Sequence, residues 1–101
     1  MVHYEDVTLC QIRYSQDSIA RRFQSGQSIY KTNYSIDNYP ELDCVRYNGD
    51  IYTLNNRTLF AMKNDLNQYY DTVTVRIVKK PRDWEIYSLT AWGNGTDIDV
   101  R

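Results

Sequence analysis

The pair Asn48-Gly49 constrains the fold of this chain more than any other short stretch. Asn-Gly is the preferred pair for the centre of a type I′ turn, because both central positions need a positive φ. Before the pair, one predicted strand face carries Leu42, Cys44 and Arg46 and the other carries Asp43, Val45 and Tyr47; residues 50–54 form a β-prone run after it. The stretch "LDCVRYNGDIYTL" therefore predicts an antiparallel β-hairpin.

Three further segments have the features of strands. Residues 72–80, "TVTVRIVKK", alternate apolar with mainly polar side chains, and Pro81 follows them. Residues 7–14, "VTLCQIRY", are predicted to form the first strand, and the tail "GNGTDIDVR" a turn followed by an edge strand. The segment "WEIYSLTAW" before that tail fits either a short strand or a short helix.

The segment "SQDSIARRFQSG" predicts a first helix. Ser15 or Asp17 can cap its start, and Ile19 and Phe23 lie four residues apart on one helical face. Gly26 follows as a residue that commonly ends helices. This helix would follow the first predicted strand directly.

A second helix is predicted directly after the hairpin. Asn55 or Asn56 serves as its cap, and it runs for about two turns before Asn64 and Asp65 end it. The polar residues 27–40 are expected to form an irregular connection. The order of elements predicts an α+β fold: one domain, residues 1–101, with a small mixed sheet, a β-hairpin and two to three short helices.

Composition and charge exclude several classes of protein. The chain has 12 basic and 13 acidic residues and a formal net charge of −1, which disfavours bulk, non-specific binding to nucleic acid. The N-terminus is too polar for a secretory signal, and no apolar run approaches the ~20 residues of a membrane helix. We therefore expect a cytoplasmic protein without a membrane partner.

The two cysteines, Cys10 and Cys44, lie far apart in the sequence and lack CxxC spacing. With His3 as the only histidine, they do not indicate a zinc site. Both lie inside β-like runs, so we expect two buried thiols rather than a disulfide.

The start of the second predicted helix carries the most informative polar cluster, Asn55-Asn56-Arg57-Thr58. A helix start offers unpaired backbone N–H groups and the positive end of the helix dipole. Arg57 adds a planar guanidinium that suits a phosphate or carboxylate, and Thr58 adds a hydroxyl. These four residues are the candidate phosphate-binding site. The alternative is a plain N-cap followed by a solvated arginine.

Other polar residues form weaker patterns. Ser18, Arg21 and Arg22 lie on the first predicted helix and are candidates for a second phosphate contact, with solvated arginines as the alternative. No pair of carboxylates has a spacing diagnostic of acid–base catalysis, so the sequence identifies no catalytic residue. Trp84 and Trp92 fit either a base-stacking platform or core packing.

Four segments together resemble a known group of proteins. They are "IRYSQDSIARRFQSGQSI", "LDCVRYNGDIYTLNNRTLFAMK", "VTVRIV" and "GNGTDIDVR", in an order that covers most of residues 12–101. This order resembles the ParB/sulfiredoxin-like superfamily, in particular its small ParB-like nuclease-type domains. The resemblance implies a ParB/sulfiredoxin-like fold in which Asn55, Asn56 and Arg57 bind nucleotide phosphates, with Thr58 where many relatives have a second arginine.

Two departures narrow what the resemblance implies. Asn55 stands where sulfiredoxins place a reactive cysteine, two residues before the arginine, so sulfinic acid reduction is not expected. A chain of 101 residues has no room for the helix-turn-helix and dimer domains of ParB partition proteins, so chromosome partitioning is not expected either.

Two functional hypotheses stay open. The first is a domain that binds a nucleotide or nucleic acid at residues 55–58 and acts as a nuclease, another phosphodiesterase, a nucleotide hydrolase or a toxin-type effector. Its cofactor is not identified, although a nucleoside triphosphate with a divalent metal fits the resemblance. The second is a catalytically inactive module of the same fold that binds a protein partner through its tyrosines or an open sheet edge.

Overall fold

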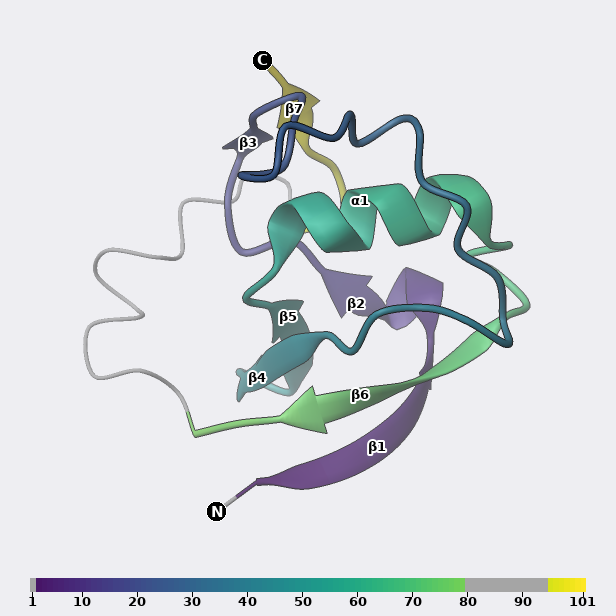
Figure 1. The fold of residues 1–101 in the computed structure, drawn as a ribbon. Coiled ribbons are helices and arrows are strands. Elements are labelled where there is room, and N and C mark those ends of the chain that lie inside the picture. Colours follow the sequence, from purple (N-terminus) through teal and green to yellow (C-terminus); the bar gives the residue numbers. More distant parts are fainter. Residues whose placement is uncertain (1, 80–94) are drawn as a thin grey trace.

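The computed structural model describes residues 2–79 and 95–101. Five strands form a mixed sheet in the order β1-β6-β4-β5-β2, and one α-helix, α1, covers one face of it (Figure 1). A separate parallel pair, β3 and β7, lies beyond α1 (Figure 1). The elements are β1 (His3–Thr8), a 3-10 helix (Leu9–Gln11), β2 (Ile12–Arg13), β3 (Ser18–Ile19), β4 (Asp43–Tyr47), β5 (Asp50–Thr53), α1 (Asn56–Asp65), β6 (Thr72–Ile77) and β7 (Asp99–Val100).

This architecture is a small mixed α+β domain, as predicted. The expectation of two to three short helices is wrong for the described residues, which contain one α-helix and one three-residue 3-10 helix. Among these residues, no helix has the length and apolar character needed to cross a membrane.

The sheet has to curl, because its two edge strands are neighbours in the sequence. β1 and β2 form opposite edges, yet only the three residues of the 3-10 helix separate them. A connection of that length spans on the order of 10 Å, so the two edges come close to each other. The curled sheet presents a concave face, and α1 lies against it (Figure 1).

The core lies between this concave face and α1. Leu59 and Met62 of α1 are fully buried in one cluster with Cys44 of β4 and Val75 of β6. Burying a leucine or methionine side chain contributes about 1.5–3 kcal/mol, so this packing fixes the position of α1. Since α1 begins almost directly after β5, the same packing places the helix start at one end of the sheet.

The predicted hairpin is confirmed. β4 and β5 pair in antiparallel fashion, with Tyr47 opposite Asp50. Asn48 has a φ of 51° and Gly49 a φ of 84°. Both values are positive, as a type I′ turn requires.

The strand predicted for residues 72–80 is confirmed as β6. Its valines and its isoleucine are buried, and the residues between them are more exposed. The edge strand predicted in the tail is present as β7. The segment "WEIYSLTAW", its two tryptophans and Pro81 lie outside the described residues.

The single strand predicted for residues 7–14 is wrong, because the 3-10 helix interrupts it. The backbone N–H groups of Leu9 and Cys10 donate to the carbonyl oxygens of Asp71 and Gln68, at 3.2 and 2.8 Å. These partners are distant in sequence, and they bend the chain where the local pattern continues. As a result the segment supplies both edges of the sheet instead of one strand.

The helix predicted for residues 15–26 is also wrong. The chain forms β3 there, and Ile19 pairs with Val100 of β7. Ile19 is only 3% exposed, so its burial in this strand pair outweighs the helical spacing that it makes with Phe23. Gly26 has a φ of 92° and lies in a turn rather than at a helix end.

The remaining local predictions had mixed outcomes. Residues 27–40 contain turns and residues of two isolated bridges, Arg22 with Ser28 and Ser35 with Asn38, but no longer element, as expected. Both cysteines are free thiols. Cys44 is buried as predicted, whereas Cys10 is exposed because it lies in the 3-10 helix and not in a strand.

Candidate anion-binding site

An open pocket of about 420 Å³ lies at the start of α1. Three segments that are distant in sequence form it: the chain around β3, the turn from β5 into α1, and the end of the chain after β7. Its polar lining consists of Gln16, Ser18, Asn55, Asn56, Arg57, Thr58 and Arg101. All four residues of the predicted phosphate site therefore line one pocket.

Asn56 holds two of these segments together. Its side-chain oxygen accepts a hydrogen bond from the backbone N–H of Ser15 (2.8 Å), and its Nδ2 donates to the Ser15 hydroxyl (3.0 Å). Both residues are buried. The side chain of Asn56 is thus committed to positioning the segment that carries Gln16 and Ser18, not directed at a ligand.

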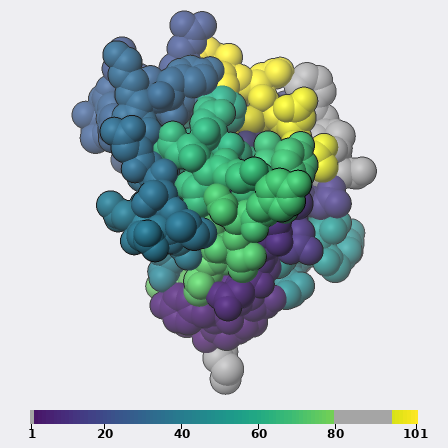
Figure 2. All heavy atoms as spheres, turned by 90° about the vertical axis from the view of Figure 1, so that its right-hand side faces the viewer, coloured from purple at the N-terminus to yellow at the C-terminus, as the bar shows by residue number. Residues whose placement is uncertain are grey.

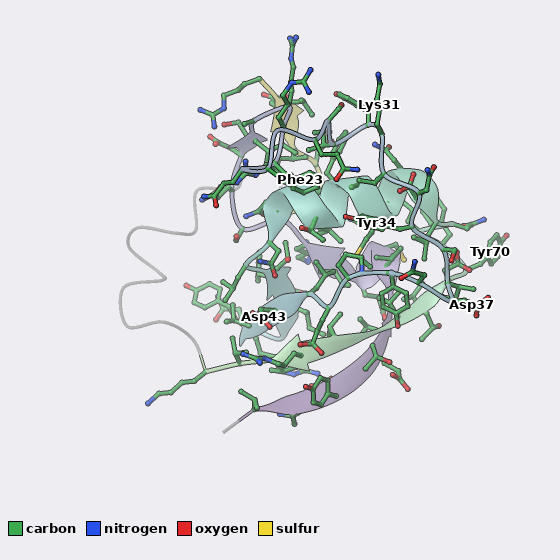
Figure 3. The ribbon with its side chains drawn as sticks, in the orientation of Figure 1. Phe23, Lys31, Tyr34, Asp37, Asp43 and Tyr70 are labelled. Carbon is green, nitrogen blue, oxygen red and sulfur yellow. The ribbon has the colours of Figure 1, made fainter. Side chains whose placement is uncertain are left out.

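Asn55 occupies the N-cap position, but its side chain does not cap α1. Its Oδ1 accepts from the backbone N–H of Asp43 (2.9 Å), and its own backbone N–H donates to Thr53 Oγ1 (2.9 Å). Asp43 and Phe23 lie on either side of the helix start (Figure 3). The side chain of Asn55 therefore ties the helix start to β4.

The absence of a side-chain cap affects the backbone of the first helical turn. Leu59 donates its N–H to the carbonyl of Asn55 (2.9 Å). Within residues 2–79 and 95–101, the backbone N–H groups of Arg57 and Thr58 have no hydrogen-bond acceptor. These two groups are at the positive end of the helix dipole, where an anion is favoured.

Arg57 is held in place by a neutral group. Its Nη1 donates to the backbone carbonyl of Arg22 (2.7 Å), and in the described part of the chain its guanidinium has no carboxylate partner. A carbonyl orients the guanidinium without neutralising its charge. The remaining N–H donors of the planar fork stay available for a further acceptor.

Arg101 is a second arginine that lines the pocket, and the residue patterns in the sequence did not identify it. Its backbone N–H donates to the carbonyl of Ile19 (2.9 Å), which extends the pairing of β7 with β3. Gln16 was missed as well. Both residues lie in segments that carry the family resemblance, which is the one signal in the sequence that could have identified them.

Of the three residues predicted to make a second phosphate contact, only Ser18 lies in this pocket. Arg21 and Arg22 line a separate hollow of about 430 Å³ together with Tyr30. The Arg22 guanidinium donates to the carbonyl of Gly26 (2.8 Å). Arg22 contributes to the anion pocket through its backbone carbonyl, which holds Arg57.

The pocket has the groups for binding an anion and lacks an obvious general base. No aspartate, glutamate or histidine is among its lining residues in the described part of the chain. The same described residues contain no group of three His, Cys, Asp or Glu side chains that could hold a metal ion. The lining can thus stabilise negative charge but offers no side chain to activate water.

Comparisons of the chain with protein-family models, with curated proteins and with solved structures gave no match.

Proposed function

We propose that this chain binds a phosphate-bearing ligand, a nucleotide or a nucleic acid, in the pocket at the start of α1. The observation that carries the proposal is that two arginines, Arg57 and Arg101, line a pocket to which the described part of the chain contributes no aspartate or glutamate side chain. The backbone N–H groups of Arg57 and Thr58, which have no acceptor among the described residues, lie at the same helix start. Charge-assisted hydrogen bonds from arginine are well suited to phosphate oxygens.

The family resemblance supports the same proposal. Three of the four segments that carry it contribute polar residues to this one pocket, although two of these segments are at opposite ends of the resembling region. We therefore interpret the chain as a ParB-like, nuclease-type domain with a ParB/sulfiredoxin-like fold. Under this interpretation, hydrolysis of the ligand needs a water-activating group from outside the pocket lining, such as a divalent metal bound with the ligand.

Titration of isotope-labelled protein with ATP, CTP and short single-stranded DNA and RNA tests the proposal. We expect amide shifts in residues 54–60 and at Arg101, and about tenfold weaker binding in Arg57→Ala, which corresponds to ~1.4 kcal/mol. Arg46→Ala is the matched control, because Arg46 is paired with Glu5 on the sheet, away from the pocket. If residues 54–60 do not respond to any of these probes, the proposal is wrong.

The same protein should be assayed on labelled DNA and RNA with and without a divalent metal. Cleavage that Arg57→Ala abolishes supports a nuclease. Binding without cleavage instead restricts the function to ligand recognition.

A protein-binding module is the second candidate function. Tyr69 and Tyr70 are 70% and 82% exposed, and Tyr70 projects from the turn after α1 (Figure 3). Tyrosines of this kind are common in protein interfaces. Partner capture that Tyr70→Ala abolishes and Arg57→Ala does not affect would favour this candidate.

A further inference from the structure

The hollow that Arg21 and Arg22 line borders the anion pocket. Its other described lining residues are Ser28, Tyr30 and Val100. Val100 is followed directly by Arg101, which lines the anion pocket, and Arg21 is preceded by Ala20, which lines that pocket too. Because consecutive Cα atoms are only about 3.8 Å apart, the linings of the two hollows meet beside the β3–β7 pair.

The loop that forms this hollow is held in shape by backbone hydrogen bonds. The N–H of Ile29 donates to the carbonyl of Arg21, and the N–H of Phe23 donates to the carbonyl of Gln27, both at 2.9 Å. Ile29 is fully buried, so it anchors the loop to the body of the protein. Arg21 and Tyr30 therefore lie on the two arms of a loop whose shape is already set.

Arg22 connects this loop to the anion pocket. Its backbone carbonyl accepts a hydrogen bond from Nη1 of Arg57 (2.7 Å), while its own Nη1 donates to the carbonyl of Gly26 (2.8 Å). In the described part of the chain, neither Arg21 nor Arg22 has a carboxylate partner. The positive charges of both arginines are therefore not neutralised by these residues.

The segment around the hollow is basic, although the whole chain has a net charge of −1. Residues 18–36 contain three basic residues and no aspartate or glutamate. The third of these, Lys31, is exposed and projects away from the body of the protein (Figure 3). Figure 2 shows this segment, in blue, at the same end of the molecule as the yellow C-terminal segment that carries Arg101. Asp99, which pairs with Ser18, lines neither hollow.

Tyr30 adds an aromatic ring to this basic surface. The residue is 58% exposed, and its ring makes an edge-to-face contact with Phe60 of α1, with ring centroids 5.6 Å apart. The contact fixes the position of the ring and leaves much of it accessible. Basic residues beside an accessible aromatic ring are the combination that binds the backbone and the bases of single-stranded nucleic acids.

We propose that the ligand of the anion pocket is a single-stranded nucleic acid that extends into this hollow. One phosphate binds at Arg57 and Arg101, a neighbouring phosphate binds at Arg21 and Arg22, and a base stacks on Tyr30. A nucleoside monophosphate has no second phosphate to bind, and a duplex keeps its bases stacked on one another. Stacking accepts any base, so the binding has little sequence preference. This inference rests on the proposed function and specifies its ligand.

Fluorescence anisotropy with the full chain tests this inference. The probes are labelled thymidine and uridine oligonucleotides of about eight nucleotides, a length in the usual range for a small single-strand binding site. The competitors are thymidine 5′-monophosphate, a duplex of the same length and an oligoglutamate peptide. We expect the single strands to bind at least about tenfold more tightly than each competitor, because only they engage both hollows and the ring.

Variants assign the second phosphate and the base. Arg21→Ala should weaken binding of the single strand by about five- to tenfold and lower the slope of log Kd against log salt by about 0.7, the value for one lost phosphate contact. Tyr30→Leu should weaken it by about tenfold, and Tyr30→Phe should retain it, because the ring is kept. Arg46→Ala is the control, since Arg46 is paired with Glu5 on the sheet. Neither Arg21→Ala nor Tyr30→Leu should affect amide shifts caused by thymidine monophosphate.

The outcomes separate this inference from the proposed function. If thymidine monophosphate binds and Arg57→Ala weakens it, but the single strand binds no more tightly, the inference is wrong and the phosphate pocket remains. The same conclusion follows if Arg21→Ala and Tyr30→Leu bind the single strand as the unchanged protein does, or if the duplex or the acidic peptide binds more tightly than the single strand. If no phosphate-bearing probe binds, both proposals are wrong.

Discussion

The arginines of the large sheet and those of the anion pocket have opposite surroundings. On the sheet each arginine of β2, β4 and β6 faces a carboxylate; the pairs are Arg13 with Asp50 (3.4 Å), Arg46 with Glu5, and Arg76 with Asp43 (3.1 Å). In the pocket, Arg57 is held by a backbone carbonyl, and Arg101 has no carboxylate partner in the described part of the chain.

The sheet ion pairs affect the local charge of the protein more than its folding stability. An exposed ion pair contributes only about 0–1 kcal/mol, so the sheet pairs do little to explain why the domain folds. They do cancel the local positive charge, and they leave the pocket arginines as a place where an outside anion is favoured. The protein's near-neutral total charge therefore hides an uneven distribution.

The largest effect is expected from separating the C-terminal segment from the body of the protein. Gly95 has a φ of 73°, and a Cβ there would lie 2.4 Å from the backbone oxygen of Tyr14. Gly95→Ala should lower the free energy of unfolding by about 2–4 kcal/mol, because strain and a backbone clash add together. Chemical denaturation measures this change.

The control for this variant is Gly26→Ala. Gly26 also has a positive φ, but nothing lies within 4 Å of its hypothetical Cβ. It should therefore cost only about 1 kcal/mol, for the backbone conformation alone. Equal losses in the two variants would show that the C-terminal segment is not docked against Tyr14 as described.

The second prediction concerns a variant that adds a carboxylate beside a pocket arginine, as the sheet arginines already have. Thr58→Asp places an acid in the first turn of α1, beside Arg57. Binding of a phosphate-bearing probe should weaken by about 100-fold, or ~2.7 kcal/mol, because the new charge both pairs with the guanidinium and repels the ligand. Thermal stability should stay the same or rise slightly, since an acid is favoured at a helix start. Unchanged binding would contradict the view that the pocket binds anions because its arginines, unlike those of the sheet, lack a carboxylate partner.

The third prediction compares the two asparagines at the helix start. Asn56→Ala removes two hydrogen bonds to Ser15 and leaves a buried backbone N–H without an acceptor, so it should destabilise the domain by about 2 kcal/mol. Asn55 is exposed, and Asn55→Ala should cost about 0.5–1 kcal/mol. Urea unfolding distinguishes them. The opposite order would mean that Asn55, and not Asn56, joins the segments of the pocket.

Local sequence patterns predicted the elements whose signals are local. Asn48-Gly49 specified its turn, and the alternation in β6 specified a half-buried strand. The predictions failed where distant partners decide the conformation. Ile19 has helical spacing but is buried in a strand pair with the far end of the chain. The chain bends at the 3-10 helix, whose backbone N–H groups donate to the carbonyl oxygens of Gln68 and Asp71.

In the candidate site, too, local sequence predicted some residues, and contacts between distant segments decided the others. Arg57 and Thr58 could be selected because a helix start is recognisable from sequence. Arg101 could not be selected from residue patterns, because its approach depends on the pairing of β7 with β3. The local sequence also could not show that the side chain of Asn56 would bind Ser15 rather than a ligand.

The smallest expected effect concerns the ion pair between Arg46 and Glu5 on the sheet, and it depends on pH. Hydrogen bonds from Arg46 and then from His3 lower the pKa of Glu5 below its usual value of 4.5. Because the pKa is lower in the folded state, the pair contributes its stability above pH 4.5, and this contribution is lost as the pH falls through the lowered value.

In Arg46→Ala the loss of stability at neutral pH should be less than about 1 kcal/mol, since the pair is partly exposed to solvent. The difference between the variant and the unchanged protein should shrink in acid and in high salt, because protonation and screening both remove the attraction. A difference that persists in acid after Glu5 has been protonated would mean that Arg46 stabilises β4 through packing of its side chain and not through its charge.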